Sequence, residues 1–170
     1  SQEICFVPDQ DYAGLVKRRS PNAFRAGELV TSDGKPVGTH EGHQHFTIGQ
    51  RKGVGVAFGR PIYVVDIDPN QNRVTLGDKE QLLKRTLVAN QINVLSDRLT
   101  RSADSSTTPL RCTAKIRYNH QPQPATVTRT GDDALTVTFD DPQSAITPGQ
   151  AVVCYDGDIV LCGGWIELAE

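Results

Sequence analysis

The stretch ATVTRTGDDALTVTF, residues 125–139, decides the fold of the second half of this chain. Two short runs in it alternate apolar side chains with threonine, and a polar turn around Asp132 and Asp133 separates them. Alternation with a period of two residues is typical of strands that bury one face. Residues 125–129 and 134–139 are therefore predicted to be strands joined by a solvated turn.

Other stretches of the second half have the same strand-like character and recur at intervals of roughly ten residues. They are residues 87–94, 110–118, 151–155 and 159–168, with a polar loop predicted at 102–109. Strand candidates at this spacing, separated by polar turns, predict a small closed β-barrel of six strands over residues 87–170.

Residues 1–86 predict a separate, smaller β-rich domain. A short helix is expected at 9–19 and short helical turns at 78–85, with hairpins at 27–40 and 61–77. An extended piece is expected to begin at His45–Ile48, before the glycine-rich loop Gly49–Gly55. The fold class is thus mainly β, or β-rich α+β, in two modules with a boundary near residue 87.

The composition is that of a globular protein, with 37% hydrophobic and 22% charged residues among 170. The net charge of −2 makes strong non-specific binding to nucleic acid unexpected. No apolar run approaches the roughly 20 residues that cross a bilayer, so we expect a cytoplasmic protein that does not enter a membrane. The chain starts at Ser1 and contains no Met, which predicts a fragment or a processed product.

Metal binding is not predicted. The cysteines form no CxxC pair, and His40, His43 and His45 lie in a turn-like stretch without a nearby cysteine to complete a zinc site. Cys112, Cys154 and Cys162 lie among strand-like residues and are interpreted as small buried hydrophobes.

Two places could carry chemistry. Gln50, Arg51 and Lys52 lie in the glycine-rich loop, where they either contact a phosphate or form a structural turn with solvated charges. Cys5 lies in a polar segment and is either a reactive thiol or an inert one, since thiol chemistry needs a reachable thiolate near positive charge.

Several motifs resemble those of the bacterial tRNA 2-thiouridylases, and the resemblance spans nearly the whole chain. For the central domain of that family they are SQEICFVP (1–8), GTHEG (38–42) and FTIGQRKG (46–53). For its C-terminal barrel they are KIRY (115–118), PQSAITPGQAVV (142–153) and Gly163–Gly164. Cys162 departs from the family pattern, which usually has glycine at that position.

The resemblance implies a three-domain enzyme whose N-terminal PP-loop ATPase domain is absent from this sequence. It implies a barrel similar to those of translation factors, and ATP bound by the missing domain alone. The whole enzyme would adenylate the wobble uridine, and a protein persulfide would then give 2-thiouridine, AMP and a disulfide. This fragment alone would be inactive.

Site residues follow from the same resemblance. Cys5 matches the persulfide-bearing cysteine, and Arg117, Tyr118 and Gln150 match positions that contact tRNA in the family. Arg117 and Tyr118 have a plainer alternative as an exposed strand charge and a barrel-rim aromatic.

The implied partners are tRNA and a sulfur-relay protein or cysteine desulfurase, with the protein itself a monomer. Proteins of this family have also been labelled methyltransferases, but the sequence has no glycine-rich methyl-donor pocket after a first strand. The competing hypothesis is a non-catalytic β-barrel module that binds RNA or a translation factor.

Overall fold

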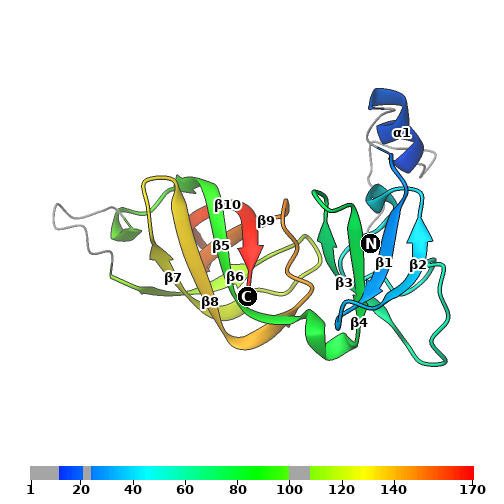
Figure 1. Ribbon diagram of the computed structural model, residues 1–170. Coiled ribbons are helices and arrows are strands. Elements are labelled where there is room, and N and C mark those ends of the chain that lie inside the picture. Colours follow the sequence, from blue (N-terminus) through cyan, green and yellow to red (C-terminus); the bar gives the residue numbers. More distant parts are fainter. Residues whose placement is uncertain (1–11, 21–23, 100–107) are drawn as a thin grey trace. The chain divides into compact units, whose positions relative to one another are not determined.

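The computed structural model describes residues 12–20, 24–99 and 108–170, which form two compact units divided between Leu82 and Leu83 (Figure 1). We call them the first unit and the barrel unit. The position near residue 87 at which the sequence suggested a boundary lies inside strand β5 (Leu83–Val94). This strand begins at Leu83 because Leu83 and Lys84 already pair with Ser144 and Gln143.

The first unit contains helix α1 (Tyr12–Arg19) and a four-stranded sheet of order β2-β1-β4-β3. Strands β1 (Gly27–Thr31) and β2 (Pro36–His40) form one antiparallel hairpin, and β3 (Tyr63–Asp68) and β4 (Arg73–Gly77) form the other. Both predicted hairpins are thus confirmed. Strands β1 and β4 pair in parallel, which joins the hairpins into one sheet.

The connection between the hairpins differs from the sequence prediction at one point. Instead of an extended piece starting at His45, residues His43–His45 form a 3₁₀ helix, η2, in which the amide of Phe46 donates to the carbonyl of His43 at 3.0 Å. Phe46, which follows this helix, has extended backbone angles, φ −115° and ψ 151°. The glycine-rich stretch that follows is a loop, as predicted.

The helical turns expected at 78–85 are shorter than predicted. They amount to a 3₁₀ helix, η3 (Lys79–Leu82), because the next residues already belong to β5. The core of the first unit consists of Leu29, Val64, Val74 and Leu76, together with Val54 and Ile62 from the loop.

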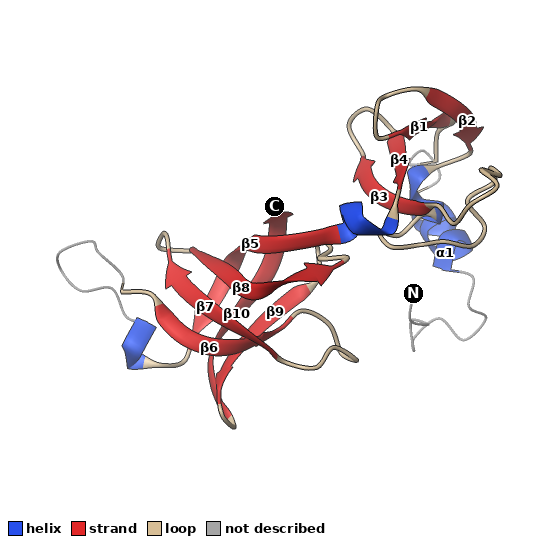
Figure 2. Cartoon of the chain, turned by 90° about the horizontal axis from the view of Figure 1, so that it is seen from below, coloured by secondary structure: helices blue, strands red, loops and turns tan. Residues whose placement is uncertain are grey.

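The barrel unit is a closed six-stranded barrel of order β10-β5-β8-β7-β6-β9 (Figure 2). This confirms the predicted fold class. Beside β5, its strands are β6 (Leu110–Lys115), β7 (Gln123–Arg129), β8 (Ala134–Ser144), β9 (Ala151–Asp156) and β10 (Ile159–Ala169). A 3₁₀ helix, η4 (Asp97–Leu99), follows β5.

The alternating pattern of residues 125–139 decides what faces the barrel interior. Ala125, Val127, Val137 and Phe139 are buried, at 0% to 1% exposure, whereas the threonines between them are not. Residues beyond the strand ends complete the same core, since Leu99 follows β5, Ile116 follows β6 and Ile146 follows β8. The barrel is thus filled with side chains.

No helix in the described part of the chain is long and apolar enough to cross a lipid bilayer.

Candidate functional site

The persulfide candidate Cys5 lies outside the described residues. The site can therefore be built only from the loop residues of the two units.

One end of the barrel is formed by the loops 116–122 and 145–150, and we call it the Arg117 end. Strands β6 and β9 pair antiparallel, with Lys115, the last residue of β6, opposite Val153. Arg117, just after β6, and Gln150, just before β9, therefore lie at the same end of this strand pair. A hydrogen bond of 3.4 Å from Nη1 of Arg117 to the carbonyl of Ser144 links the loop 116–122 to the end of β8, directly before the loop 145–150.

Tyr118 is a large aromatic side chain of this end with 81% exposure. Strand β6 ends at Lys115, not at Tyr118 as the sequence suggested, because the fully buried Ile116 is followed by a turn that points Arg117 and Tyr118 to solvent. Nζ of Lys115 lies 5.7 Å from the centre of the Tyr118 ring, a distance typical of a cation–π contact. A free aromatic face thus stands beside two cations.

Gln150 is held mainly through its backbone. Its amide donates to the carbonyl of Thr147 at 3.3 Å, and its carbonyl accepts from the amide of Ile166 at 2.8 Å. The preceding Gly149 has a φ of 83° and donates to the carbonyl of Ile166 at 2.8 Å. These hydrogen bonds hold the loop against β10, so the backbone that carries the half-buried Gln150 side chain has a fixed position.

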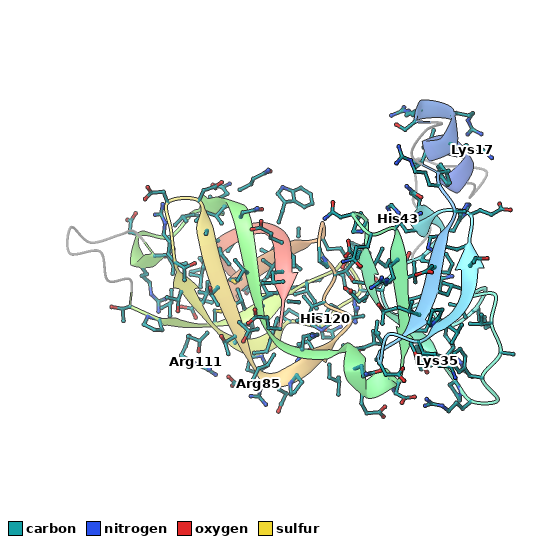
Figure 3. The ribbon with its side chains drawn as sticks, viewed as in Figure 1. Lys17, Lys35, His43, Arg85, Arg111 and His120 are labelled. Carbon is teal, nitrogen blue, oxygen red and sulfur yellow. The ribbon has the colours of Figure 1, made fainter. Side chains whose placement is uncertain are left out.

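His120 also belongs to this end and was not singled out from the sequence (Figure 3). One of its ring nitrogens, Nε2, lies 3.1 Å from Oε1 of Gln143, while Nε2 of Gln143 donates to the carbonyl of Asp141. Oε1 of Gln143 is therefore an acceptor, so Nε2 of His120 carries the proton. The other nitrogen, Nδ1, is buried and makes no hydrogen bond to a described residue.

Burial lowers the pKa of His120, and the charges of Arg117 and Lys115 add to this effect, whereas the hydrogen bond that His120 donates to Gln143 opposes it. A neutral imidazole suits a structural link between loop 116–122 and strand β8. The sequence signal that could have identified it is the triplet Asn119-His120-Gln121, which directly follows Arg117 and Tyr118.

The glycine-rich loop belongs to the first unit. Gln50 uses its amide group internally, because Oε1 accepts from the amide of Thr47 at 3.0 Å and Nε2 donates to the carbonyl of Lys52 at 2.9 Å. Its backbone is tied to β3 through Val64. Arg51 and Lys52 are exposed, and Arg51 lines a cavity of about 400 Å³.

The three histidines predicted not to bind a metal make separate contacts. Nδ1 of His40 accepts from the amide of Gly42 at 3.1 Å, Nδ1 of His43 lies 3.0 Å from Oδ1 of Asn72, and the ring of His45 packs edge-on against Phe24. Within residues 12–20, 24–99 and 108–170, no three histidine, cysteine or acidic side chains are placed to hold a metal ion together.

Comparison with known proteins assigns both units. Residues 15–78 match the model described as the tRNA methyl transferase PRC-barrel domain, and residues 84–166 match the aminomethyltransferase beta-barrel domain. These ranges follow the division of the structure into two units.

Relatives with the name tRNA-specific 2-thiouridylase MnmA match almost the entire chain. The proteins from Clostridioides difficile and Koribacter versatilis are 49% identical over 167 residues and 48% over 171, each covering 98% of this chain. The Carboxydothermus hydrogenoformans protein is 47% identical over 167 residues. The chain spans 45% of the length of the first two relatives and 44% of the third. We conclude that the chain belongs to the family of tRNA-specific 2-thiouridylases, as the central and C-terminal barrel domains of such a protein.

Proposed function

We propose that this chain is the part of a tRNA-modifying sulfurtransferase that carries the sulfur and contacts the tRNA. The reaction would be ATP-dependent 2-thiolation of the wobble uridine. Relatives with the name tRNA-specific 2-thiouridylase, at 47% to 49% identity, support the proposal.

Cys5 has the role of sulfur carrier in this proposal. The uridine C2 oxygen is first adenylated, which turns it into a leaving group. The outer sulfur of a Cys5 persulfide attacks C2, and AMP departs with that oxygen. A second cysteine then attacks the Cys5 sulfur, which leaves 2-thiouridine and a disulfide between the two cysteines.

The Arg117 end of the barrel would contact the tRNA. A guanidinium binds a phosphate or a base edge, and an exposed Tyr ring stacks on an unpaired base. The observation that carries this assignment is the 81% exposure of Tyr118 beside Lys115 and Arg117. Gln150, on the neighbouring loop, would add an amide to the same surface.

Other components of the reaction are assigned outside this sequence. As the resemblance to the tRNA 2-thiouridylases implies, ATP would be bound by a PP-loop domain of the longer protein. The loop Gly49–Gly55 itself does not have the GxxxxGK[ST] spacing of a nucleotide-binding P-loop. Sulfur would come from a cysteine desulfurase, directly or through a relay protein.

The test is a thiolation assay with the longer protein. Cys5→Ser is expected to abolish 2-thiouridine formation, whereas Cys112→Ser, a matched loss of one thiol in the barrel, leaves it intact. Full activity of Cys5→Ser would remove Cys5 from the mechanism.

A second candidate is a non-catalytic module that binds RNA or a translation factor. It is favoured by the full burial of Cys154 and Cys162, which keeps these two thiols out of reach of a substrate. Mass spectrometry of the chain after incubation with a cysteine desulfurase and its substrate separates the two candidates. An added sulfur atom on Cys5 favours the enzyme, and an unmodified Cys5 favours the binding module.

A further inference from the structure

A cavity of about 400 Å³ lies against the loop 51–62 of the first unit. Its walls differ in character, since Arg51 and Arg60 supply charge, while Val54, Phe58 and Ile62 supply an apolar surface. Val54 and Ile62 are each only 5% exposed and belong to the core of the unit, so this floor rests on the sheet.

The charges that line the cavity are all positive. Arg51 is exposed and makes no ion pair with another described residue. Arg60 pairs with Asp78, but the side chains of this pair are 57% and 46% exposed, so water screens the interaction. No Asp or Glu lines the cavity itself. Asp33 and Asp78 line an adjoining hollow that shares Phe58 and Arg60, so the preference of the cavity for an anion rests mainly on Arg51.

The backbone of the loop leaves room for a ligand to approach closely. Gly55 and Gly59 have φ values of 78° and 67°, which other residues adopt at a cost in energy. A Cβ atom added at either glycine would have no atom within 4 Å. Ligand atoms can thus reach the main chain at Gly59, which lines the cavity, and Gly55 lies between the lining residues Val54 and Val56.

The half-buried Phe58 adds an aromatic surface between the two arginines in sequence. A free phosphate would use the cations and leave the apolar floor in water. A nucleotide would use both, because its phosphate pairs with guanidinium and its base packs on an aromatic or apolar side chain.

We propose that this cavity binds one unpaired nucleotide of the RNA substrate, with its phosphate at Arg51 and Arg60 and its base against Phe58. The choice of RNA as the ligand rests on the function proposed above. The proposal gives the first unit an RNA-binding role separate from the contacts assigned to Arg117, Tyr118 and Gln150.

The binding test requires no catalysis. The backbone amide signals of the ¹⁵N-labelled chain are followed by NMR during titration with uridine 5′-monophosphate, uridine and ribose 5-phosphate. We expect saturable shifts confined to residues 51–62, with a Kd near 1 mM for the nucleotide and at least about tenfold weaker binding of the other two probes.

Variants assign the binding to the cavity. Arg51→Gln is expected to weaken binding of the nucleotide about fivefold or more, and Phe58→Leu is expected to remove its advantage over ribose 5-phosphate. Lys17→Gln removes a cation of α1 that does not line the cavity, and should leave the affinity unchanged (Figure 3). Phe58→Leu keeps an apolar side chain, and the spectrum of each free variant shows whether it is folded.

Absence of saturable shifts up to about 10 mM would overturn the proposal. Equal binding of ribose 5-phosphate and the nucleotide would do so too, since the base then contributes nothing. In the longer protein, Arg51→Gln should raise the KM for tRNA without lowering kcat. A longer protein that forms no 2-thiouridine at all would refute the proposed function, whereas an unchanged KM in an active enzyme would refute only the role of this cavity.

Discussion

Neighbouring side chains at the Arg117 end of the barrel differ in burial. Tyr118 is almost fully exposed and contributes little to the core, whereas the adjacent Ile116 is fully buried. The proposed contact with tRNA and the stability of the barrel therefore involve different residues of one short loop, and substitutions can test them independently.

Tyr118→Ala should weaken tRNA binding by the longer protein by about 1–3 kcal/mol, the range for loss of one base–aromatic stack. The free energy of unfolding should hardly change, because the ring is exposed. Filter binding and urea denaturation measure the two quantities. Ile159→Ala, a truncation of a 66% exposed side chain at the other end of the barrel, is the control and should leave tRNA binding unaltered.

The three thiols of the barrel unit differ in reactivity for a physical reason. A hydrogen bond from Cys154 lowers the pKa of the half-buried Cys112, and the charge of Arg111 also lowers it. Hydrogen bonds to Cys112 and Cys162, together with burial, raise the pKa of Cys154. Cys154 and Cys162 are both 0% exposed.

In the folded chain, iodoacetamide should thus alkylate Cys112 well before Cys154 and Cys162. Peptide mass spectrometry at successive times measures the order. Denaturant provides the control, because unfolding should make the three rates similar. Equal rates without denaturant would contradict the described burial.

Two histidines make stability depend on pH. Burial lowers the pKa of His40, and it is also the main cause of the lowered pKa of His120. In the unfolded chain both titrate near the usual value of 6.5. Between the folded and unfolded pKa values the unfolded state binds more protons, so the free energy of unfolding falls as the pH drops below about 6.5.

Urea midpoints measured between about pH 8 and pH 5.5 should show this loss, in a range where carboxylates stay ionised. His120→Gln keeps a polar side chain opposite Gln143 and should reduce the pH dependence. A midpoint that stays constant over this range would contradict the assigned direction of the pKa shifts.

At the scale of elements, glycines of β10 allow close approach between strands. A Cβ atom at Gly164 would lie 2.9 Å from the carbonyl oxygen of Asn90 on β5 and 3.1 Å from Cγ2 of Ile92. Strand β10 joins β5 there with an irregular register between Gly163 and Trp165. The pairing of β10 with β5, which closes the barrel, thus requires glycine at position 164.

Gly164→Ala should lower the free energy of unfolding by about 1–3 kcal/mol, the usual cost of overpacking. Gly131→Ala is the matched control, since the nearest atom to its added Cβ would be 3.4 Å away. Thermal denaturation of both variants measures the difference, and an equal effect would show that the pairing of β10 with β5 can relax.

The elements that the sequence predicted well are those defined by local patterns. The hairpin around Asp33 and Gly34 has a turn signal between two apolar runs, and residues 125–139 alternate with a period of two. Patterns that depend on distant partners were not predictable. They include the parallel pairing of β1 with β4 and the irregular register near Arg85, where the partner of β5 shifts from Gln143 to Thr138.

The candidate site could be predicted only in part for the same reason. Arg117, Tyr118 and Gln150 follow from motif resemblance, and their shared position at one barrel end follows from strand order. His120 has only its neighbourhood to Arg117 and Tyr118 as a local signal, and Arg60 has none. Their positions depend on contacts with Gln143 and Asp78, which lie in other elements.

For the whole molecule, the division between the units can be tested by truncation. A chain that starts at Leu83 should fold alone, because its barrel is closed and has its own core. A chain that starts at Leu87 lacks the pairs of Leu83 and Lys84 with β8. It also lacks the bonds of Arg85 and Thr86 to Glu170.

The shorter chain should be less stable by about 2–4 kcal/mol, given three lost backbone hydrogen bonds at 0.5–1.5 kcal/mol each and the lost pairing with β8. Urea denaturation followed by circular dichroism compares the two. Equal stability would show that the barrel needs only the part of β5 that starts at Leu87.

The pairing of β10 with β5 has a consequence for synthesis on the ribosome. Strand β5 is synthesised first but pairs with β10, which is synthesised last. Until then the other five strands can form only an open sheet whose two edge strands, β5 and β9, have unpaired backbone groups. Ribosome-bound chains halted before Ile159 should accordingly recruit holding chaperones, and release of the final strand should end that dependence.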